Sequence, residues 1–212
     1  MDLADPTESR DLCIQTHDLP MDKKKIEDLS NLVFGLALAL GAISLTRPDR
    51  DEFSSLFQII VQFGLSFAII IWIWWIYNNL VAEQDMDRRG MILLNVLLLF
   101  LVVIEPFLLS ISLPYSSGKV AYSLDLGIVL LILALFAQFA ISEARLAPTE
   151  HHRKRLRLSR NTSILCAAIF FTSLLPQFML AENGSTVQST MWLSALFIGV
   201  IGRNILGWKK VD

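Results

Sequence analysis

The chain has 212 residues and a mass of 23.9 kDa; 54% of its residues are hydrophobic, only 18% are charged, and its mean hydropathy is +0.54. So high an apolar fraction excludes an ordinary soluble domain and favours an all-α integral membrane protein with about one domain. The net charge of −2 and the pI near 5.9 suggest no nucleic-acid partner. Two cysteines far apart in the chain, Cys13 and Cys166, cannot form a disulfide framework or a metal knuckle.

The pattern along the chain predicts two short tails and one membrane domain. Residues 1–28 mix acids, bases and prolines without a sustained apolar run, so we expect a cytosolic N-terminal tail and no signal peptide. Residues 29–206 hold six apolar segments, each of at least about 17 residues, the lower limit for a helix that crosses a bilayer. Residues 207–212 form a short C-terminal tail. The six predicted transmembrane helices are Leu29–Leu45, Leu56–Val81, Met91–Leu113, Ala121–Ser142, Ser163–Ala181 and Thr190–Leu206.

The basic residues of the flanking and connecting segments are divided unevenly between the two sides that six spans would create. The opposite side has only Arg47, Arg50 and Lys119, whereas the side of the N-terminus has 13. Because cytoplasmic loops carry an excess of Lys and Arg, this distribution predicts that both termini are cytosolic. The residues on the N-terminal side are Lys23, Lys24, Lys25, Arg88, Arg89, Arg145, Arg153, Lys154, Arg155, Arg157, Arg160, Lys209 and Lys210.

The connection at 143–162 contains two adjacent histidines within a basic run. His151 and His152 do not share a helix face and no third ligand is evident, so we predict no metal site and no cofactor. The basic run is better explained as a cytosolic topology signal that also contacts lipid headgroups.

Acidic residues inside the spans are costly and therefore candidates for function. Glu105 lies before Pro106 in the third span, and Asp125 lies near the start of the fourth, both toward the outer half of the membrane in the predicted orientation. They are candidates for a cation-attracting outer vestibule. The alternative is a pair of interfacial carboxylates bound to Lys119 or to backbone groups.

Aromatic residues and prolines give further expectations about the spans. A group at the cytosolic end of the second span, Trp72, Trp74, Trp75 and Tyr77, is typical of an aromatic belt at the membrane interface. Pro106 and Pro176 should kink the third and fifth spans, because proline removes a backbone donor. No phosphate loop, zinc-protease helix or nucleophile elbow occurs, so we do not expect an enzyme.

The segment that opens the first span resembles the signature of the transmembrane protein 175 family of potassium-permeable channels. In that signature an arginine stands four positions before Phe-Ser-Asp, and here Lys25, Leu29, Ser30 and Asn31 occupy those places. The family's Phe-Trp-x-x-His-His end of the second span is similar to 75–79, where Asn78 and Asn79 replace the histidines. An Asp-Arg-Arg turn at 87–89 and a helix similar to the family's Asn-Leu-Leu-Leu-Leu at 95–99, which closes on Pro106, extend the likeness over residues 25–113.

The residues that differ from the family's signature also differ in their chemistry. Lysine lacks the planar fork of arginine, and an amide cannot carry the charge of a carboxylate. A network of neutral amides is therefore expected to replace the charged network of the family, and ion selectivity is the property most affected.

The resemblance implies a homotetramer in the cell membrane, in which the first helix of each subunit lines a central pore for potassium or other monovalent cations. By position, its apolar constriction would be formed by Leu36, Ala39 and Ile43. Two alternatives stay open: a secondary ion-coupled transporter, which would show saturable flux, and a membrane scaffold, which would show none.

Overall fold

The protein folds into a bundle of long helices in a computed structural model that describes residues 23–43, 53–81, 89–112, 116–142, 149–179 and 184–207. The described residues are helical apart from one short turn and one capping residue. The helices are α1 (Lys23–Ile43), α2 (Phe53–Val81), α3 (Arg89–Ser112), α4 (Ser116–Ser142), α5 (Glu150–Thr172), the four-residue α6 (Pro176–Met179) and α7 (Gly184–Gly207).

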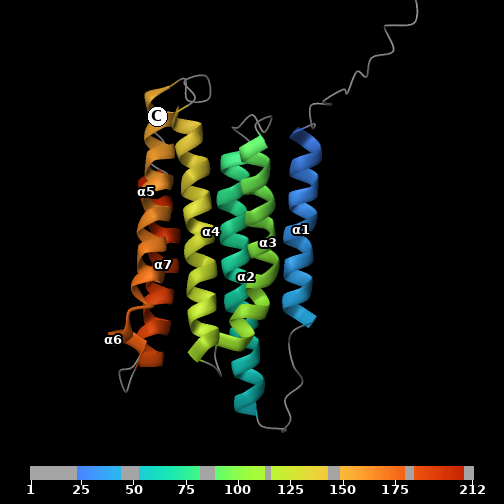
Figure 1. The fold of residues 1–212 in the computed structure, drawn as a ribbon, viewed down its shortest axis with the longest axis vertical. Helices are drawn as coiled ribbons and strands as arrows, with labels where there is room; N and C mark the ends of the chain where they lie inside the picture. The colour runs from blue at the N-terminus through green and yellow to red at the C-terminus, as the bar shows by residue number, and fades with distance from the viewer. Residues whose placement is uncertain are drawn as a thin grey trace, which may run out of the picture.

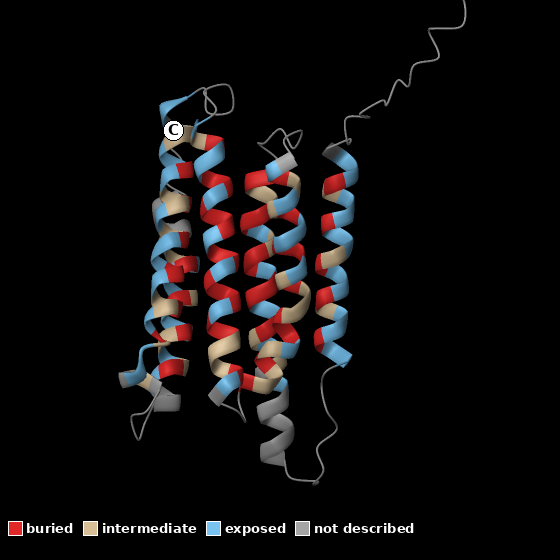
Figure 2. Ribbon diagram, in the orientation of Figure 1, coloured by how far each residue is buried: buried red, intermediate tan, exposed pale blue. Residues whose placement is uncertain are grey.

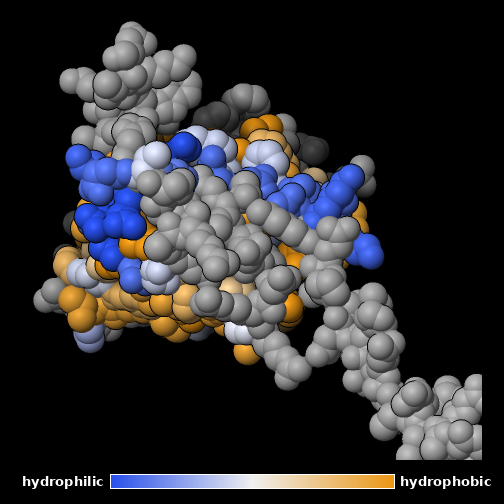
Figure 3. All heavy atoms as spheres, turned by 90° about the horizontal axis from the view of Figure 1, so that it is seen from above, coloured by the Kyte–Doolittle hydropathy of each residue, from blue (hydrophilic) through white to orange (hydrophobic). Residues whose placement is uncertain are grey.

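The long helices lie roughly side by side, with α1 at one edge of the bundle and α5 and α7 at the other (Figure 1). The middle is formed by α2, α3 and α4; α1 packs on α2 and α3, whereas α4 packs on both α3 and α5. Successive long helices run in opposite directions, so the start of α1 and the start of α5 lie at the same end (Figure 1). The basic residues of these two helix starts therefore share one end of the bundle. Figure 3 looks onto that end, where hydrophilic residues gather above hydrophobic flanks.

Four of the six expected spans are long and apolar enough to cross a membrane: Lys24–Ile43, Phe63–Val81, Gly90–Ser112 and Ser117–Ser142. Such helices satisfy every backbone hydrogen bond internally, as the hydrocarbon core requires. In α7 the apolar stretch is shorter, Val187–Ile201. The composition thus correctly predicted an all-α membrane protein, whereas α5 and α7, although long, are not apolar over a full span by the same measure within the described ranges.

The fifth predicted segment differs most from the structure. We expected a loop over 143–162 and a helix over Ser163–Ala181, but α5 already begins at Glu150 and ends at Thr172. Thr149 caps its first turn, since the hydroxyl accepts the His152 backbone N–H at 3.3 Å. A turn at 173–175 then separates α5 from α6. The expected kink at Pro176 is thus a complete break, because proline disfavours the helical conformation of the residue before it and clashes with the carbonyl four residues back. By contrast, α3 continues through Pro106.

The core lies between the helices, and their outer faces are exposed (Figure 2). Two glycines permit the close approach of an aromatic ring from another helix. A Cβ added to Gly199 of α7 would lie 2.1 Å from Cζ2 of Trp72, and one added to Gly127 of α4 would lie 2.7 Å from Cζ of Phe171. Both positions accept only glycine unless a ring moves.

Candidate functional site

The candidate site is the first helix and the groups that hold it against the bundle. Its inner side buries Ile26, Ser30, Phe34 and Ala37, which recur every three or four residues and so share one helix face. The C-terminal part of this face also approaches α3 closely, because a Cβ on Gly41 would lie 3.4 Å from Cβ of Pro106. These contacts fix which side of α1 faces away from its own subunit.

The outward side of α1 is apolar and exposed. Leu36 is 52% exposed and Ile43 is 77% exposed, and Ala39 is exposed between them. Leu29 and Leu32 continue the same stripe toward the N-terminal end. Spacings of three and four residues place all five on one face, so α1 is apolar on both sides. The structure therefore brings the three predicted constriction residues together on a face that no described part of the subunit covers.

Ser30 anchors α1 to two other helices through a buried hydroxyl of α2. The Ser30 Oγ and Tyr77 Oη atoms are 2.7 Å apart, and Tyr77 donates its proton to Oδ1 of Asn95 at 2.7 Å. Ser30 has one proton, which can go either to Tyr77 or to the Ile26 carbonyl oxygen at 2.8 Å. The two hydroxyls therefore have two protons for three contacts, and either Ser30 or Tyr77 can be the donor in the bond between them. We call Ser30, Tyr77 and Asn95 the hydroxyl relay; it joins α1, α2 and α3.

Asn31 makes a second link between α1 and α2. Trp74 Nε1 donates to its Oδ1 atom at 2.9 Å. The neutral amide that replaces the family's aspartate therefore accepts a hydrogen bond from an uncharged indole, which agrees with the expected network of neutral groups.

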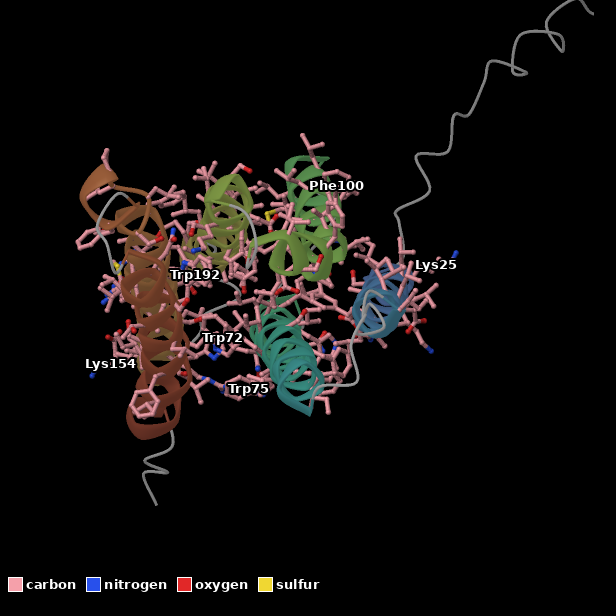
Figure 4. All side chains as sticks on the ribbon, turned by 90° about the horizontal axis from the view of Figure 1, so that it is seen from below. Lys25, Trp72, Trp75, Phe100, Lys154 and Trp192 are labelled. Carbon is pink, nitrogen blue, oxygen red and sulfur yellow. The ribbon has the colours of Figure 1, made fainter. Side chains whose placement is uncertain are left out.

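The other predicted members of the signature lie apart from this link. Asn79 donates to the Trp75 carbonyl oxygen of its own helix at 2.6 Å, and Asn78 is half-buried. Lys25 is exposed and points away from the bundle, as does Lys154 at the other edge (Figure 4). The roles of Asn78, Asn79 and Lys25 thus stay predictions.

Tyr77, Trp74 and Asn95 are the partners that sequence reasoning missed. Tyr77 is fully buried and Trp72 nearly so, and the prediction that both belong to an interfacial aromatic belt is wrong. Figure 4 shows Trp72 pointing from α2 toward the side of α5 and α7. The phenol of Tyr77 next to a run of tryptophans and isoleucines was the available signal, because a buried Tyr hydroxyl usually finds a partner.

A second polar group lies inside the bundle. Ser66 of α2 donates to Oε2 of Glu105 at 2.8 Å, and Tyr122 of α4 lies beside the same carboxylate. Asp125 follows Tyr122 by one helical turn and is close enough to Glu105 for the two charges to act on each other. We call Ser66, Glu105, Tyr122 and Asp125 the acidic cluster. Glu105 has no exposed surface and Asp125 is 4% exposed, so both are interior groups of the subunit, and their part in an outer vestibule stays a prediction.

The predicted partner of these carboxylates is not found. Both Asp125 oxygens and Oε1 of Glu105 have no hydrogen-bond partner, and in the described ranges no ion pair joins either carboxylate to Lys119. The described residues also hold no group of three or more metal-ligating side chains of the His, Cys, Asp and Glu types.

A chain of hydrogen bonds continues from the acidic cluster toward α7. Tyr122 meets Trp192 edge to face, with ring centroids 4.8 Å apart. Trp192 Nε1 donates to Oγ of Ser123 at 3.0 Å, and Ser123 lies 3.1 Å from Oγ of Ser173. Because Ser173 donates to the Phe170 carbonyl oxygen at 2.6 Å, Ser123 is the donor between the two hydroxyls. These bonds hold α4, α5 and α7 together.

Helices of membrane-spanning length, neutral polar links between them and an uncovered apolar helix define an all-helical integral membrane protein. The model of the TMEM175 family, described as the endosomal/lysosomal potassium channel TMEM175, matches residues 25–106. That stretch holds the Ser30 and Asn31 links and all of the residues to which they bond. The match covers residues 25–106 of the 212, so the chain is similar to the TMEM175 family over this part of its length.

Two individual proteins are similar to the chain. One is a protein of Marivirga tractuosa named potassium channel, 27% identical over 124 residues, which cover 58% of this chain. The matched part spans about half of that relative, 49% of its length. The other is a crystal structure of a variant of the potassium channel MtTMEM175 in complex with a nanobody–MBP fusion protein. Its TM-score is 0.58 at 18% identity, with 90% of this chain and 96% of that chain covered, so the likeness concerns the fold.

Proposed function

We propose that the protein is a potassium-permeable channel in which four copies of the chain surround a central pore lined by α1. The observation that carries this proposal is the uncovered apolar face of α1. A helix that is apolar on every side needs a partner or lipid on each of them. The inner side already has its partners in α2 and α3, and the outer side carries Leu36, Ala39 and Ile43 at the spacing of one stripe. Two similar proteins are named potassium channels, which supports the same activity here.

The proposed topology has six membrane crossings, with both termini in the cytosol and the protein in the cell membrane. The four apolar helices supply four of these crossings, and α5 with α6 and α7 supply the others. The basic starts of α1 and α5 share one end of the bundle, which agrees with the positive-inside rule.

The proposed mechanism is conduction through a narrow apolar constriction. Rings of Leu36, Ala39 and Ile43 side chains close the pore by dewetting and open it when the α1 helices move outward. A hollow of about 220 Å³ between α1 and α2, lined in part by Gly35, Leu38 and Ile70, gives α1 room to move. Apolar rings discriminate ions only by the cost of dehydration, so we expect modest preference for potassium over sodium.

Potassium flux into liposomes that contain the purified protein tests the proposal. The wild-type protein should pass potassium faster than sodium, without saturation. The Leu36→Asn variant should raise the flux, because a polar ring keeps the constriction hydrated. Leu93→Asn is the matched control: Leu93 is 70% exposed on α3, and its substitution should leave the flux unchanged.

Each other outcome argues against the proposal. Saturating, ion-coupled flux would favour a secondary transporter, and no flux from any of the three proteins would favour a scaffold. Equal increases in Leu36→Asn and Leu93→Asn would show that the Leu36 effect does not come from a pore.

A further inference from the structure

The acidic cluster lies between α2, α3 and α4 and belongs to neither the apolar stripe of α1 nor the hydroxyl relay. Its two carboxyl groups come from different helices and interact with each other, although both are buried. Burial of one uncompensated carboxylate in a membrane protein is costly, and two neighbouring ones repel each other as well. The arrangement therefore favours a compensating positive charge, from bound protons or from a bound cation.

No described side chain supplies that charge. Asp125 has two oxygen atoms without a hydrogen-bond partner and Glu105 has one, whereas the other Glu105 oxygen accepts the Ser66 hydroxyl. The interior positions around them add hydroxyl and aromatic groups, chiefly Tyr122, which lies within range of both carboxylates. The three unpartnered atoms are carboxylate oxygens, with hydroxyl oxygens of Ser66 and Tyr122 close by.

We propose that the acidic cluster is a binding site for a small metal cation, buried within each subunit and separate from the central pore. Hard cations such as sodium, potassium and calcium are bound by carboxylate and hydroxyl oxygens. The bound ion neutralises Glu105 and Asp125 and joins α3 to α4. Because Pro106, the neighbour of Glu105, packs against Gly41 of α1, the ion also stiffens the support of the proposed pore helix.

Thermal unfolding of the purified full-length protein in nanodiscs tests this site without any flux measurement. The probes are the chlorides of sodium, potassium and calcium, compared at constant ionic strength with N-methyl-D-glucamine, which is too large for a buried site. At least one metal ion should raise the unfolding midpoint in a saturable way, by roughly 5 °C at a concentration about 100-fold above its Kd. Intrinsic tryptophan fluorescence gives a second readout, because one of the five tryptophans, Trp192, contacts Tyr122.

Two neutral variants of similar shape, Asp125→Asn and Glu105→Gln, should lose the metal-dependent rise. Each should also be at least as stable as the wild type in N-methyl-D-glucamine, because the amide removes the uncompensated charge. Asp28→Asn is the control, since Asp28 is an exposed acid on α1 and its loss should leave the metal response intact.

Three results would overturn the site. The first is the same midpoint in all four cations, and the second is an unchanged metal response in both Asp125→Asn and Glu105→Gln. The third is an equal rise on acidification in N-methyl-D-glucamine alone with no further effect of metal, which would assign the positive charge to a proton. A failed channel assay would leave all of these readouts unaffected.

Discussion

Removal of the Tyr77 hydroxyl is the sharpest test of how α1 is held to its subunit. Tyr77→Phe keeps the ring, which packs against Phe34 at 5.5 Å and Phe136 at 6.4 Å between centroids, and deletes two hydrogen bonds of 2.7 Å. Each bond contributes about 1 kcal/mol in soluble proteins and about 0.6 kcal/mol within membrane bundles. Oδ1 of the buried Asn95 also loses its donor, so we expect a total loss of about 2 kcal/mol in the free energy of unfolding.

A double-mutant cycle shows whether this loss comes from the hydroxyl relay. Asn95→Leu alone should also destabilise, because it removes the 2.7 Å bond from Tyr77 and leaves the Tyr77 hydroxyl only its contact with Ser30. The double variant should be more stable than the sum of the two single effects predicts, by about 1 kcal/mol, since both partners of one bond are then absent. A detergent titration of the purified proteins measures the free energy of unfolding of the wild type, the two single variants and the double variant. Ser123→Ala serves as the control, because it acts on the bonds near α7 and its effect should simply add to that of Tyr77→Phe.

A neutral Tyr77→Phe substitution, or strictly additive effects of Tyr77→Phe and Asn95→Leu, would refute the reasoning. The first result would mean that the relay does not hold α1 in place, and the second would mean that the Tyr77–Asn95 bond does not join α2 to α3.

Two further substitutions test the packing of the remaining helices. Gly199→Ala should lower the free energy of unfolding by about 1–3 kcal/mol, because its Cβ would lie 2.1 Å from the ring of Trp72. Gly64→Ala is the control and should be tolerated, since a Cβ at Gly64 would have nothing within 4 Å. Thermal unfolding of both variants makes the comparison. Trp192→Phe keeps an aromatic ring against Tyr122 but removes the 3.0 Å hydrogen bond to Ser123. We expect the free energy of unfolding to fall by about 1 kcal/mol in the same assay. Full stability of the variant would argue against that bond.

The sequence predicted the apolar helices well because a bilayer imposes a length and a composition on every span. It predicted the helix ends less well, since helices continue past the hydrocarbon where polar residues are solvated. We expected the first span to begin at Leu29, but α1 begins at Lys23. The basic run that we interpreted as a loop is likewise the first part of α5. Its low hydrophobicity indicated a polar environment and not a loss of helical structure.

The candidate site could be predicted only in part, because its partners depend on how the helices are rotated against one another. Ser30 and Asn31 were recognisable from a short signature, yet their partners Tyr77 and Trp74 were not indicated by it. The depth of Glu105 was predictable from its position in the third span. Its burial against Ser66 was not, because apolar segments show little periodicity to indicate which face is inside.

Cysteine accessibility on α1 tests the central claim, that the uncovered face of this helix lines the pore, most directly. Ala39 lies on the outward face and is exposed, whereas Ala37, two residues earlier, is fully buried on the opposite face. Each is replaced by cysteine in a background in which Cys13 and Cys166 are alanine, and a membrane-impermeant cationic thiol reagent is added during potassium flux. We predict that Ala39→Cys is blocked and that Ala37→Cys is not. Block of neither variant, or of Ala37→Cys alone, would contradict the account.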